Sequence, residues 1–372
     1  MTATETSISL PTALLPKDGR FGSGPSKVRP EAIHALSSLA QDYLGTSHRR
    51  ATVKDQVSRL RSGLINLFDL PDGWEIILGN GGTTLFWDAA SFGLIEYVSQ
   101  HLDFGEFSSK FAQVVQAAPH LAEPQIISSE PGTHPLPIAS NVDTYALTHN
   151  ETSTGVSAVL SRPPGEGLVL VDATSAAGAI QWNSSEVDCY YFAPQKALGS
   201  DGGLWLAACS PRAVERIELL ASGDRWIPAG LDLGIALTNS RQNQTYNTPS
   251  LATILLAAET VDWINESGGL QWSEARCRAS SDTIYQWADA RPFAEPFVID
   301  AGQRSPVVCT IDFDGVEADA ISRVLRANGI LDTESYRKLG RNQLRIATFP
   351  AVDPDDVRAL CACIDYIVES LT

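Results

Sequence analysis

Short apolar runs alternate with segments of helical spacing along the chain up to about residue 208. The runs cover residues 75–78, 144–148, 168–171 and 204–208, and turn-forming or polar residues separate them. Runs of this length predict buried strands, and strands that alternate with helices are typical of βαβ units. We therefore predict an α/β fold whose large domain is built on a mostly parallel central sheet.

The pattern changes in the last third of the chain. A long helix around residues 261–265 breaks at Gly268-Gly269, and a strand (307–311), a helix (318–327), a strand (344–347) and a closing helix follow. Asp353 suits the N-cap of the closing helix and Pro354 its first position. We predict a loose N-terminal arm over residues 1–16, a large domain over 17–262 and a small α+β C-terminal domain over 263–372.

Composition places the chain among folded proteins with more than one core. It has 372 residues, of which 44% are hydrophobic and 19% charged. No apolar run approaches the roughly 18–20 residues of a membrane span, and the N-terminus lacks the features of a signal peptide. The six cysteines suggest neither a disulfide framework nor a zinc site. We expect a reduced, cytoplasmic protein without a structural metal and without membrane attachment.

The charge of the chain restricts its partners. A net charge of −17 and a pI of about 4.7 argue against nucleic acid. The electric field of this negative charge also repels anionic substrates at long range, but salt screens the interaction of exposed charges beyond about 8 Å. A local cluster of cations can therefore still bind an anion. His48-Arg49-Arg50 is a candidate for that role, against the alternative of a solvated basic turn.

Two of the apolar runs end in residues that carry chemistry. Asp172 follows the run 168–171, and Lys196 follows the strand-like run that begins at Tyr190. Pyridoxal phosphate chemistry needs such a pair, because the lysine amine forms a Schiff base and the carboxylate keeps the ring nitrogen protonated. The carboxyl ends of strands are also where open α/β sheets bind ligands. The alternatives are a surface lysine and a helix-capping aspartate.

The turn Asn80-Gly81-Gly82-Thr83-Thr84 joins a predicted strand to a predicted helix. Free backbone N–H groups at a helix N-terminus bind anions, and glycines let the backbone approach closely. The turn is neither a P-loop nor a dinucleotide fingerprint. A glycine-rich turn alone is a weak signal, and it gains weight here because it precedes the aspartate–lysine pair.

With three further motifs, these elements resemble the phosphoserine aminotransferase family of fold-type I pyridoxal phosphate enzymes over nearly the whole chain. The further motifs are Gly45-Thr46-Ser47-His48-Arg49, His149-Asn150-Glu151-Thr152 and Tyr246-Asn247-Thr248-Pro249. Each motif is common, but their order along the chain is specific. The resemblance implies a homodimer whose subunits share their active sites.

The resemblance also implies roles for individual residues. Lys196 would carry the cofactor and Asp172 would pair with the pyridinium nitrogen. Phe107 would stack on the ring, where the family commonly has tryptophan, and Thr152 would contact the ring oxygen. The remaining implied contacts are Thr83, Thr84 and Gln195 to the phosphate, Asn247 and Thr248 to the phosphate from the neighbouring subunit, His48 and Arg49 to the distal anion of the substrate, and Arg345 to its α-carboxylate. Which of Arg337, Lys338 and Arg341 enters the site stays open.

The implied reaction converts glutamate and 3-phosphohydroxypyruvate into 2-oxoglutarate and O-phosphoserine, in serine biosynthesis. Whether 4-phosphohydroxythreonine of pyridoxine biosynthesis is also made stays open. The rivals are an alanine- or serine-glyoxylate aminotransferase, which has no use for a second anion site, and a cysteine desulfurase, which needs a mobile reactive cysteine. A pyridoxal phosphate-dependent regulator would need an appended DNA-binding domain, and a serine hydrolase would need a G-x-S-x-G elbow. The sequence shows neither.

Overall fold

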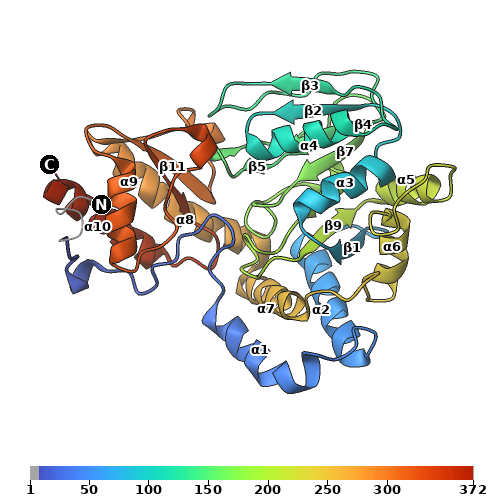
Figure 1. The fold of residues 1–372 in the computed structure, drawn as a ribbon, viewed down its shortest axis with the longest axis horizontal. Helices are drawn as coiled ribbons and strands as arrows, with labels where there is room; N and C mark the ends of the chain where they lie inside the picture. Colours follow the sequence, from blue (N-terminus) through green and yellow to red (C-terminus); the bar gives the residue numbers. More distant parts are fainter. Residues whose placement is uncertain (1–7, 372) are drawn as a thin grey trace.

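Seven strands form the central sheet of the larger lobe in the computed structural model, which describes residues 8–371 (Figure 1). Their order is β1-β9-β8-β7-β4-β2-β3, and within this sheet β9 alone runs antiparallel to its neighbours. The predicted α/β fold with a mostly parallel sheet is therefore confirmed. The strands are β1 (Glu75–Asn80), β2 (Ser99–Asp103), β3 (Gln125–Ser128), β4 (Thr144–Thr148), β7 (Leu168–Asp172), β8 (Cys189–Phe192) and β9 (Leu204–Cys209).

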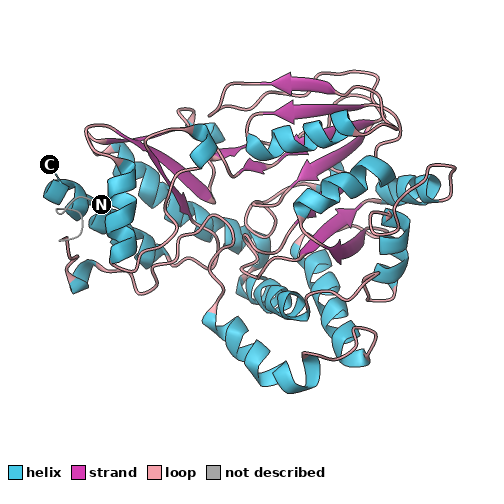
Figure 2. Cartoon of the chain, viewed as in Figure 1, coloured by secondary structure: helices cyan, strands magenta, loops and turns pink. Residues whose placement is uncertain are grey.

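Helices cover both faces of this sheet, as Figure 2 shows. Ile77 and Leu170 pack into one core with α3 to α6, whereas Ile76 and Val171 pack into another with α2 and α7. Strands that are buried on both faces read as continuous apolar runs, which is why the sequence predicted them. The helices are α1 (Pro30–Tyr43), α2 (Ala51–Leu67), α3 (Thr83–Gly93), α4 (Glu106–Ala117), α5 (Pro211–Ala221), α6 (Leu233–Arg241) and α7 (Leu251–Ser267).

The smaller lobe contains the antiparallel sheet β10-β11-β12 and three helices. Gly268 (φ 123°) and Gly269 (φ 72°) separate α7 from α8, as the sequence predicted, because both lie in the left-handed region. Asp353 accepts a hydrogen bond from the Asp355 N–H at 2.9 Å and so caps the closing helix. The elements are α8 (Gly269–Asp289), β10 (Ala294–Pro296), β11 (Val308–Phe313), α9 (Ala318–Ala327), β12 (Gln343–Ala347) and α10 (Pro354–Leu371).

Helix α8 takes part in the cores of both lobes. Cys277 lies in the core of the larger lobe, and Ile284 lies in the core of the smaller lobe. The domain boundary between residues 262 and 263 therefore stays a prediction. Within residues 8–371, no helix has both the length and the apolar character needed to span a membrane.

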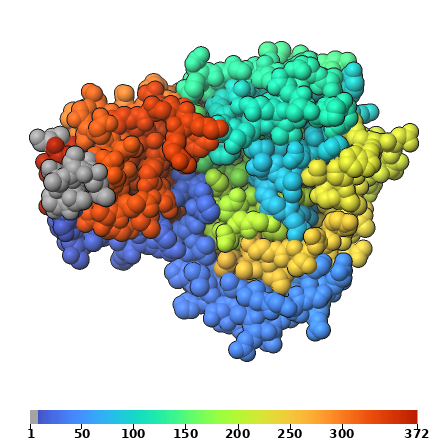
Figure 3. Space-filling view, viewed as in Figure 1, coloured from blue at the N-terminus to red at the C-terminus, as the bar shows by residue number. Residues whose placement is uncertain are grey.

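The prediction of a loose N-terminal arm is wrong for residues 8–16, while residues 1–7 lie outside the described part of the chain. Leu10 is buried in the core of the smaller lobe, and its N–H donates to Asn328 Oδ1 at 3.0 Å. The carbonyl of Leu14 accepts a hydrogen bond from Cys363 Sγ at 3.3 Å. Apolar side chains thus hold this segment against the C-terminal lobe, where Figure 3 shows it in blue beside orange and red.

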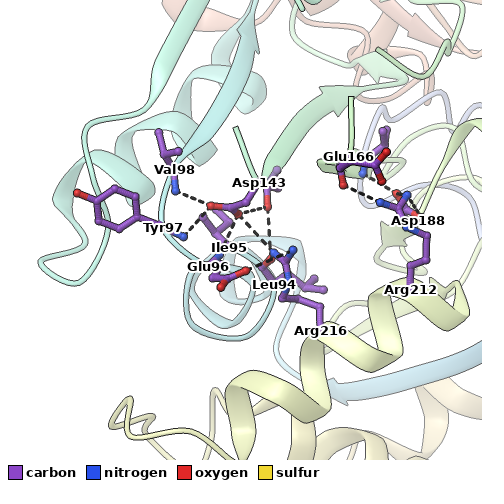
Figure 4. Close-up of polar contacts among 12 residues, drawn as sticks. Leu94, Ile95, Glu96, Tyr97, Val98, Asp143, Glu166, Asp188, Arg212 and Arg216 are labelled. Carbon is purple, nitrogen blue, oxygen red and sulfur yellow. Dashed lines mark hydrogen bonds and ion pairs between the residues drawn. The ribbon is translucent and has the colours of Figure 1, made fainter. Parts of the chain in front are cut away.

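Two aspartates at the amino edge of the sheet form ion pairs with arginines of helix α5 (Figure 4). Asp143, just before β4, accepts hydrogen bonds from the backbone N–H groups of residues 96–98 at 2.6–2.9 Å and contacts Arg216 at 3.4 Å. Asp188, just before β8, pairs with Arg212 at 3.3 Å. Both arginines belong to α5. This edge is therefore occupied by structural contacts, and the carboxyl edge is left for ligands.

Candidate active site

A cavity of about 360 Å³ lies at the carboxyl edge of the sheet. Asp172 is the last residue of β7, Lys196 follows β8, Thr83 and Thr84 begin α3 after β1, and Phe107 lies near the start of α4 after β2. Parallel strands bring their following loops to one edge, so distant sequence positions meet here. The cavity is also lined by Gly24, Pro25, Gly82, Trp87, Thr148, Asn150, Thr152, Thr174, Gln195, Asp201 and Gly202.

The Lys196 amine projects into a confined space. Its Nζ donates to the Ser23 carbonyl at 2.7 Å and lies 5.7 Å from the centre of the Phe107 ring. A Cβ at Gly24, whose φ is 138°, would lie 2.3 Å from Nζ, so only glycine fits there. Burial, helped by the nearby Arg345 charge, lowers the pKa of Lys196 to about 8. An appreciable fraction of the amine is then neutral and nucleophilic near neutral pH.

This shifted pKa predicts how cofactor capture depends on pH. Only the neutral amine attacks an aldehyde, so in cofactor-free protein the rate of capture should rise with pH and level off above about 8. Stopped-flow absorbance after mixing with pyridoxal phosphate measures this rate. Nα-acetyl-lysine, which keeps a free side-chain amine, is the control. An amine with the ordinary pKa of 10.5 continues to gain rate at higher pH. A protein profile parallel to the control would contradict the assignment.

Asp172 is a buried carboxylate that forms no ion pair within residues 8–371. Its Oδ1 accepts from the Thr174 N–H at 2.9 Å, and its Oδ2 accepts from Trp87 Nε1 at 3.2 Å. Burial raises the pKa of Asp172, and the hydrogen bonds and the Lys196 charge oppose this shift. A buried charge without a cation is costly. A protonated ring nitrogen in the cavity would supply the missing partner.

The N-terminus of α3 provides an anion cradle in the same cavity. Among the described residues, no side chain caps the N-terminus of α3. A Cβ at Gly82 would meet no atom within 4 Å. The Thr83 hydroxyl accepts a hydrogen bond from Thr174 Oγ1 at 2.8 Å. Gln195 Oε1 is buried and lacks a hydrogen-bond partner among the described residues. Open N–H groups and hydroxyls fit a phosphate, whereas the unpaired Gln195 oxygen is an acceptor and adds no donor to the cradle.

Glu151 holds the wall that carries Phe107. This fully buried carboxylate accepts hydrogen bonds from the N–H groups of Phe107 at 3.1 Å and Ser108 at 2.9 Å, and from the Ser153 hydroxyl at 2.7 Å. It thereby fixes the start of α4 against the loop that carries Thr152. Glu151 was not predicted as a site residue from the sequence, although it lies inside the motif His149-Asn150-Glu151-Thr152.

Arg345 reaches the site from the smaller lobe. It lies on β12, and its Nη1 is 3.4 Å from the Thr152 carbonyl, which is a long contact. Its Nε is buried and has no hydrogen-bond partner within the described residues. Several N–H donors of this guanidinium are therefore available to an anion.

The other predicted substrate residues lie together, but they do not line the Lys196 cavity of the same chain. His48 Nδ1 is 3.3 Å from Thr248 Oγ1, which places the predicted segments around His48 and Thr248 side by side. Arg49 lines a separate, more open hollow of about 670 Å³ with Tyr246 and Arg241. Asn247, in the same segment, also lies outside the Lys196 cavity.

Two of the three undecided basic residues form ion pairs. Lys338 Nζ lies 2.5 Å from Glu106 Oε1, and Arg341 pairs with Asp312. Arg337 begins the short 3-10 helix Arg337–Leu339 and is exposed. None of the three lines the Lys196 cavity.

Sequence reasoning missed Trp87 and Thr174, which hold Asp172 in place. Trp87 follows Thr83 by one helical turn, so both side chains face the cavity. That spacing was a usable signal. Thr174 follows Asp172 by two residues and binds it through its backbone N–H, as in a local turn. The Thr174 side chain contributes as well, because a hydrogen bond from its hydroxyl, like that from its N–H, lowers the pKa of Asp172.

Comparison with known proteins agrees with this geometry. The family described as "Aminotransferase class-V" matches residues 131–333. The phosphoserine aminotransferase of a Nocardioides species is 56% identical over 370 residues, which cover 98% of this chain and 99% of the relative. The crystal structure of a phosphoserine aminotransferase from Cytophaga hutchinsonii gives a TM-score of 0.86 at 22% identity, covering 94% of this chain and 99% of that one. Pyridoxal phosphate-bound phosphoserine aminotransferase from Trichomonas vaginalis gives a TM-score of 0.80 at 19% identity, covering 94% and 100%.

At these identities the two solved structures bear on the fold alone, whereas the matches in sequence carry the family. The fold and the sequence matches define a pyridoxal phosphate-dependent aminotransferase of class V. Within that class, the chain belongs to the phosphoserine aminotransferase family, as its motifs predicted.

Proposed function

We propose that the enzyme transfers the amino group of glutamate to 3-phosphohydroxypyruvate, which yields O-phosphoserine and 2-oxoglutarate for serine biosynthesis. The observation that carries the proposal is the single cavity in which Lys196 and Asp172 face the open N-terminus of α3. The relative at 56% identity bears the name of this activity. Both substrates carry an α-carboxylate and a second anionic group, so one site with two cationic ends serves each in turn.

The residues present fit pyridoxal phosphate. Lys196 would hold it covalently, Asp172 would face its ring nitrogen, and Phe107 would cover the ring. Thr152 would contact the ring oxygen, while Thr83, Thr84 and Gln195 would bind the phosphate. When bound, the cofactor supplies an aldehyde that condenses with an amine and a ring that accepts electrons from the substrate α-carbon.

The protein itself moves the proton. When it is not bonded to the cofactor, Lys196 Nζ would be an amine with a lowered pKa of about 8, in a cavity that restricts its motion. Such an amine takes the proton from the substrate α-carbon as a general base and later donates it again. Asp172, held by Trp87 and Thr174, keeps its negative charge aimed at one place during both steps.

The substrate would be held at both ends. The free donors of Arg345 suit the α-carboxylate, because a guanidinium pairs bidentately with a carboxylate. His48 and Arg49 would bind the distal phosphate or carboxylate. Since His48 contacts Thr248, and Asn247 and Thr248 are expected to reach the neighbouring subunit, we infer that His48 and Arg49 serve that same neighbouring site.

This arrangement predicts complementation between two inactive variants. Lys196→Ala removes one component of a site, and Arg49→Ala removes another component of the partner's site. Dimers that contain one chain of each variant should therefore hold one intact site. Mixed dimers, co-expressed with different tags and purified through both, should regain about half of the wild-type activity per dimer, since one of two sites is whole. Each variant alone stays inactive at low substrate concentration. Mixed dimers without activity would place Arg49 in its own chain's site, whereas an Arg49→Ala enzyme as active as wild type would place it in no site.

Substrate comparison tests the proposed reaction directly. With glutamate as amino donor, we expect kcat/KM to favour 3-phosphohydroxypyruvate over hydroxypyruvate by about 10²-fold or more, because the unphosphorylated acceptor leaves the distal cations unpaired. Coupled 2-oxoglutarate assays with both acceptors, and with glyoxylate, measure this ratio. Equal use of the two acceptors, or a preference for glyoxylate, would contradict the proposal.

The cellular location and a second product also belong to this proposal. All six cysteines are free and buried, which suits a cytoplasmic location and offers no exposed thiol for a desulfurase. We include 4-phosphohydroxythreonine as a second product, because its precursor carries the same two anionic ends. The same acceptor series, extended to that precursor, tests this activity.

A further inference from the structure

Tyr336 joins two parts of the site that come from different lobes. Its ring centre lies 5.3 Å from the Arg345 guanidinium carbon and 6.1 Å from the centre of the Phe107 ring, with the two rings inclined at 54°. A cation above an aromatic face is attracted by the ring, most strongly where water is excluded. Tyr336 therefore contacts both the candidate carboxylate-binding arginine and the wall of the cofactor cavity.

Arg345 has few other contacts that could fix its side chain. Its backbone is set by the pairing of β12 with β11 and by the hydrogen bond from its N–H to the Thr333 carbonyl at 3.0 Å. The guanidinium, in contrast, has only the 3.4 Å contact to Thr152, and its buried Nε is unpaired within residues 8–371. No described carboxylate forms an ion pair with it. The Tyr336 ring is thus the main contact that orients this group.

Tyr336 is itself held in place by the segment that follows it. The residues that follow it form the 3-10 helix Arg337–Leu339, and Lys338 pairs with Glu106 at 2.5 Å. Glu106 is the first residue of α4 and directly precedes Phe107. The ion pair therefore connects the segment after Tyr336 to the helix that carries the cofactor wall.

We propose that Tyr336 is a positioning residue, whose ring sets the guanidinium of Arg345 for the α-carboxylate of the substrate. The proposal rests on the proposed function, in which Arg345 binds that carboxylate. The ring face carries the effect, so the hydroxyl is dispensable. The α-carboxylate is common to glutamate and O-phosphoserine, so both amino donors depend equally on Tyr336, although their distal groups differ.

Steady-state kinetics with both donors test the proposal in the holoenzyme. Tyr336→Leu should raise KM for glutamate and for O-phosphoserine by about tenfold, with kcat within about twofold of wild type, because the cation–π contact is lost. Tyr336→Phe keeps the ring and should stay within about twofold of wild type in both constants. In an Arg345→Gln background, Tyr336→Leu should add no further increase in KM, since the group that it positions is absent.

Each contrary outcome has a separate meaning. An equal effect of Tyr336→Leu with and without Arg345, an effect on one donor alone, or loss of function in Tyr336→Phe would overturn the role of Tyr336 and leave the proposed reaction standing. If Arg345→Gln itself leaves KM unchanged for both donors, the proposed carboxylate site and the role of Tyr336 fail together. Near-identical thermal unfolding of the variants shows that the kinetics compare folded enzymes.

Discussion

Replacing Lys196 with alanine is expected to lower transamination by on the order of 10⁴-fold or more, because the variant loses the covalent attachment and the general base together. No other amine can take over as the base, since Lys196 is the only amine in the described lining of the cavity. Single-turnover assays with glutamate, read from cofactor absorbance, measure the loss without interference from product release.

Lys110→Ala is the matched control for this variant. Lys110 Nζ lies 5.6 Å from the centre of the same Phe107 ring, but it pairs with Glu106 at 3.1 Å and does not line the cavity. Its loss should leave turnover within about twofold of wild type, as expected for an exposed ion pair. A Lys196→Ala enzyme that turns over as fast as the control would remove the basis of the mechanism.

Asp172→Asn should lower kcat by on the order of 10²-fold or more, the scale of losing a preorganised charge in a buried site. The amide cannot stabilise a protonated ring nitrogen as a carboxylate does, so the ring accepts electrons less readily. Pre-steady-state rates of the glutamate half-reaction isolate this step from binding.

The same substitution also disturbs the local hydrogen bonds, and this effect needs its own control. Asp172 accepts from Trp87 and from the Thr174 backbone, so the side-chain amide in the Asp172→Asn variant would face one of these donors with a donor of its own. Trp87→Phe removes the indole donor and leaves the carboxylate charged. If Trp87→Phe slows the reaction as much as Asp172→Asn, hydrogen bonding rather than charge explains the loss.

Strands buried on both faces were predictable from sequence, and polar strands were not. Residues 168–171 form a continuous apolar run because helices cover both sides of β7. Strand β2 contains Gln100 and His101, which are buried, and its sequence gave no apolar run. Gln100 Nε2 donates to the Ile138 carbonyl at 2.9 Å and to Gln125 Oε1 at 3.0 Å, so distant residues satisfy its amide. Such compensation cannot be read from local pattern.

The residues of the candidate site also fall into two groups: those that the sequence pattern predicts, and those that only the packing of the fold brings together. Lys196 and Asp172 could be found because each ends an apolar run, and the carboxyl edge of a sheet gathers such residues. Tyr336 meets Phe107, and Arg345 meets Thr152, only because the smaller lobe packs over the cavity. Sequence order contains no trace of that packing, and the resemblance to a family supplied Arg345 but not Tyr336.

Borohydride reduction of the protein loaded with pyridoxal phosphate, followed by peptide mass spectrometry, examines the role of Lys196 without relying on activity. Reduction converts a bond between the cofactor and an amine into a stable link. We predict one pyridoxyl group per chain, located on the peptide that contains Lys196, and none in Lys196→Ala. A modified peptide elsewhere in the chain, or unmodified Lys196 in protein that has bound the cofactor, would contradict this attachment and the mechanism built on it.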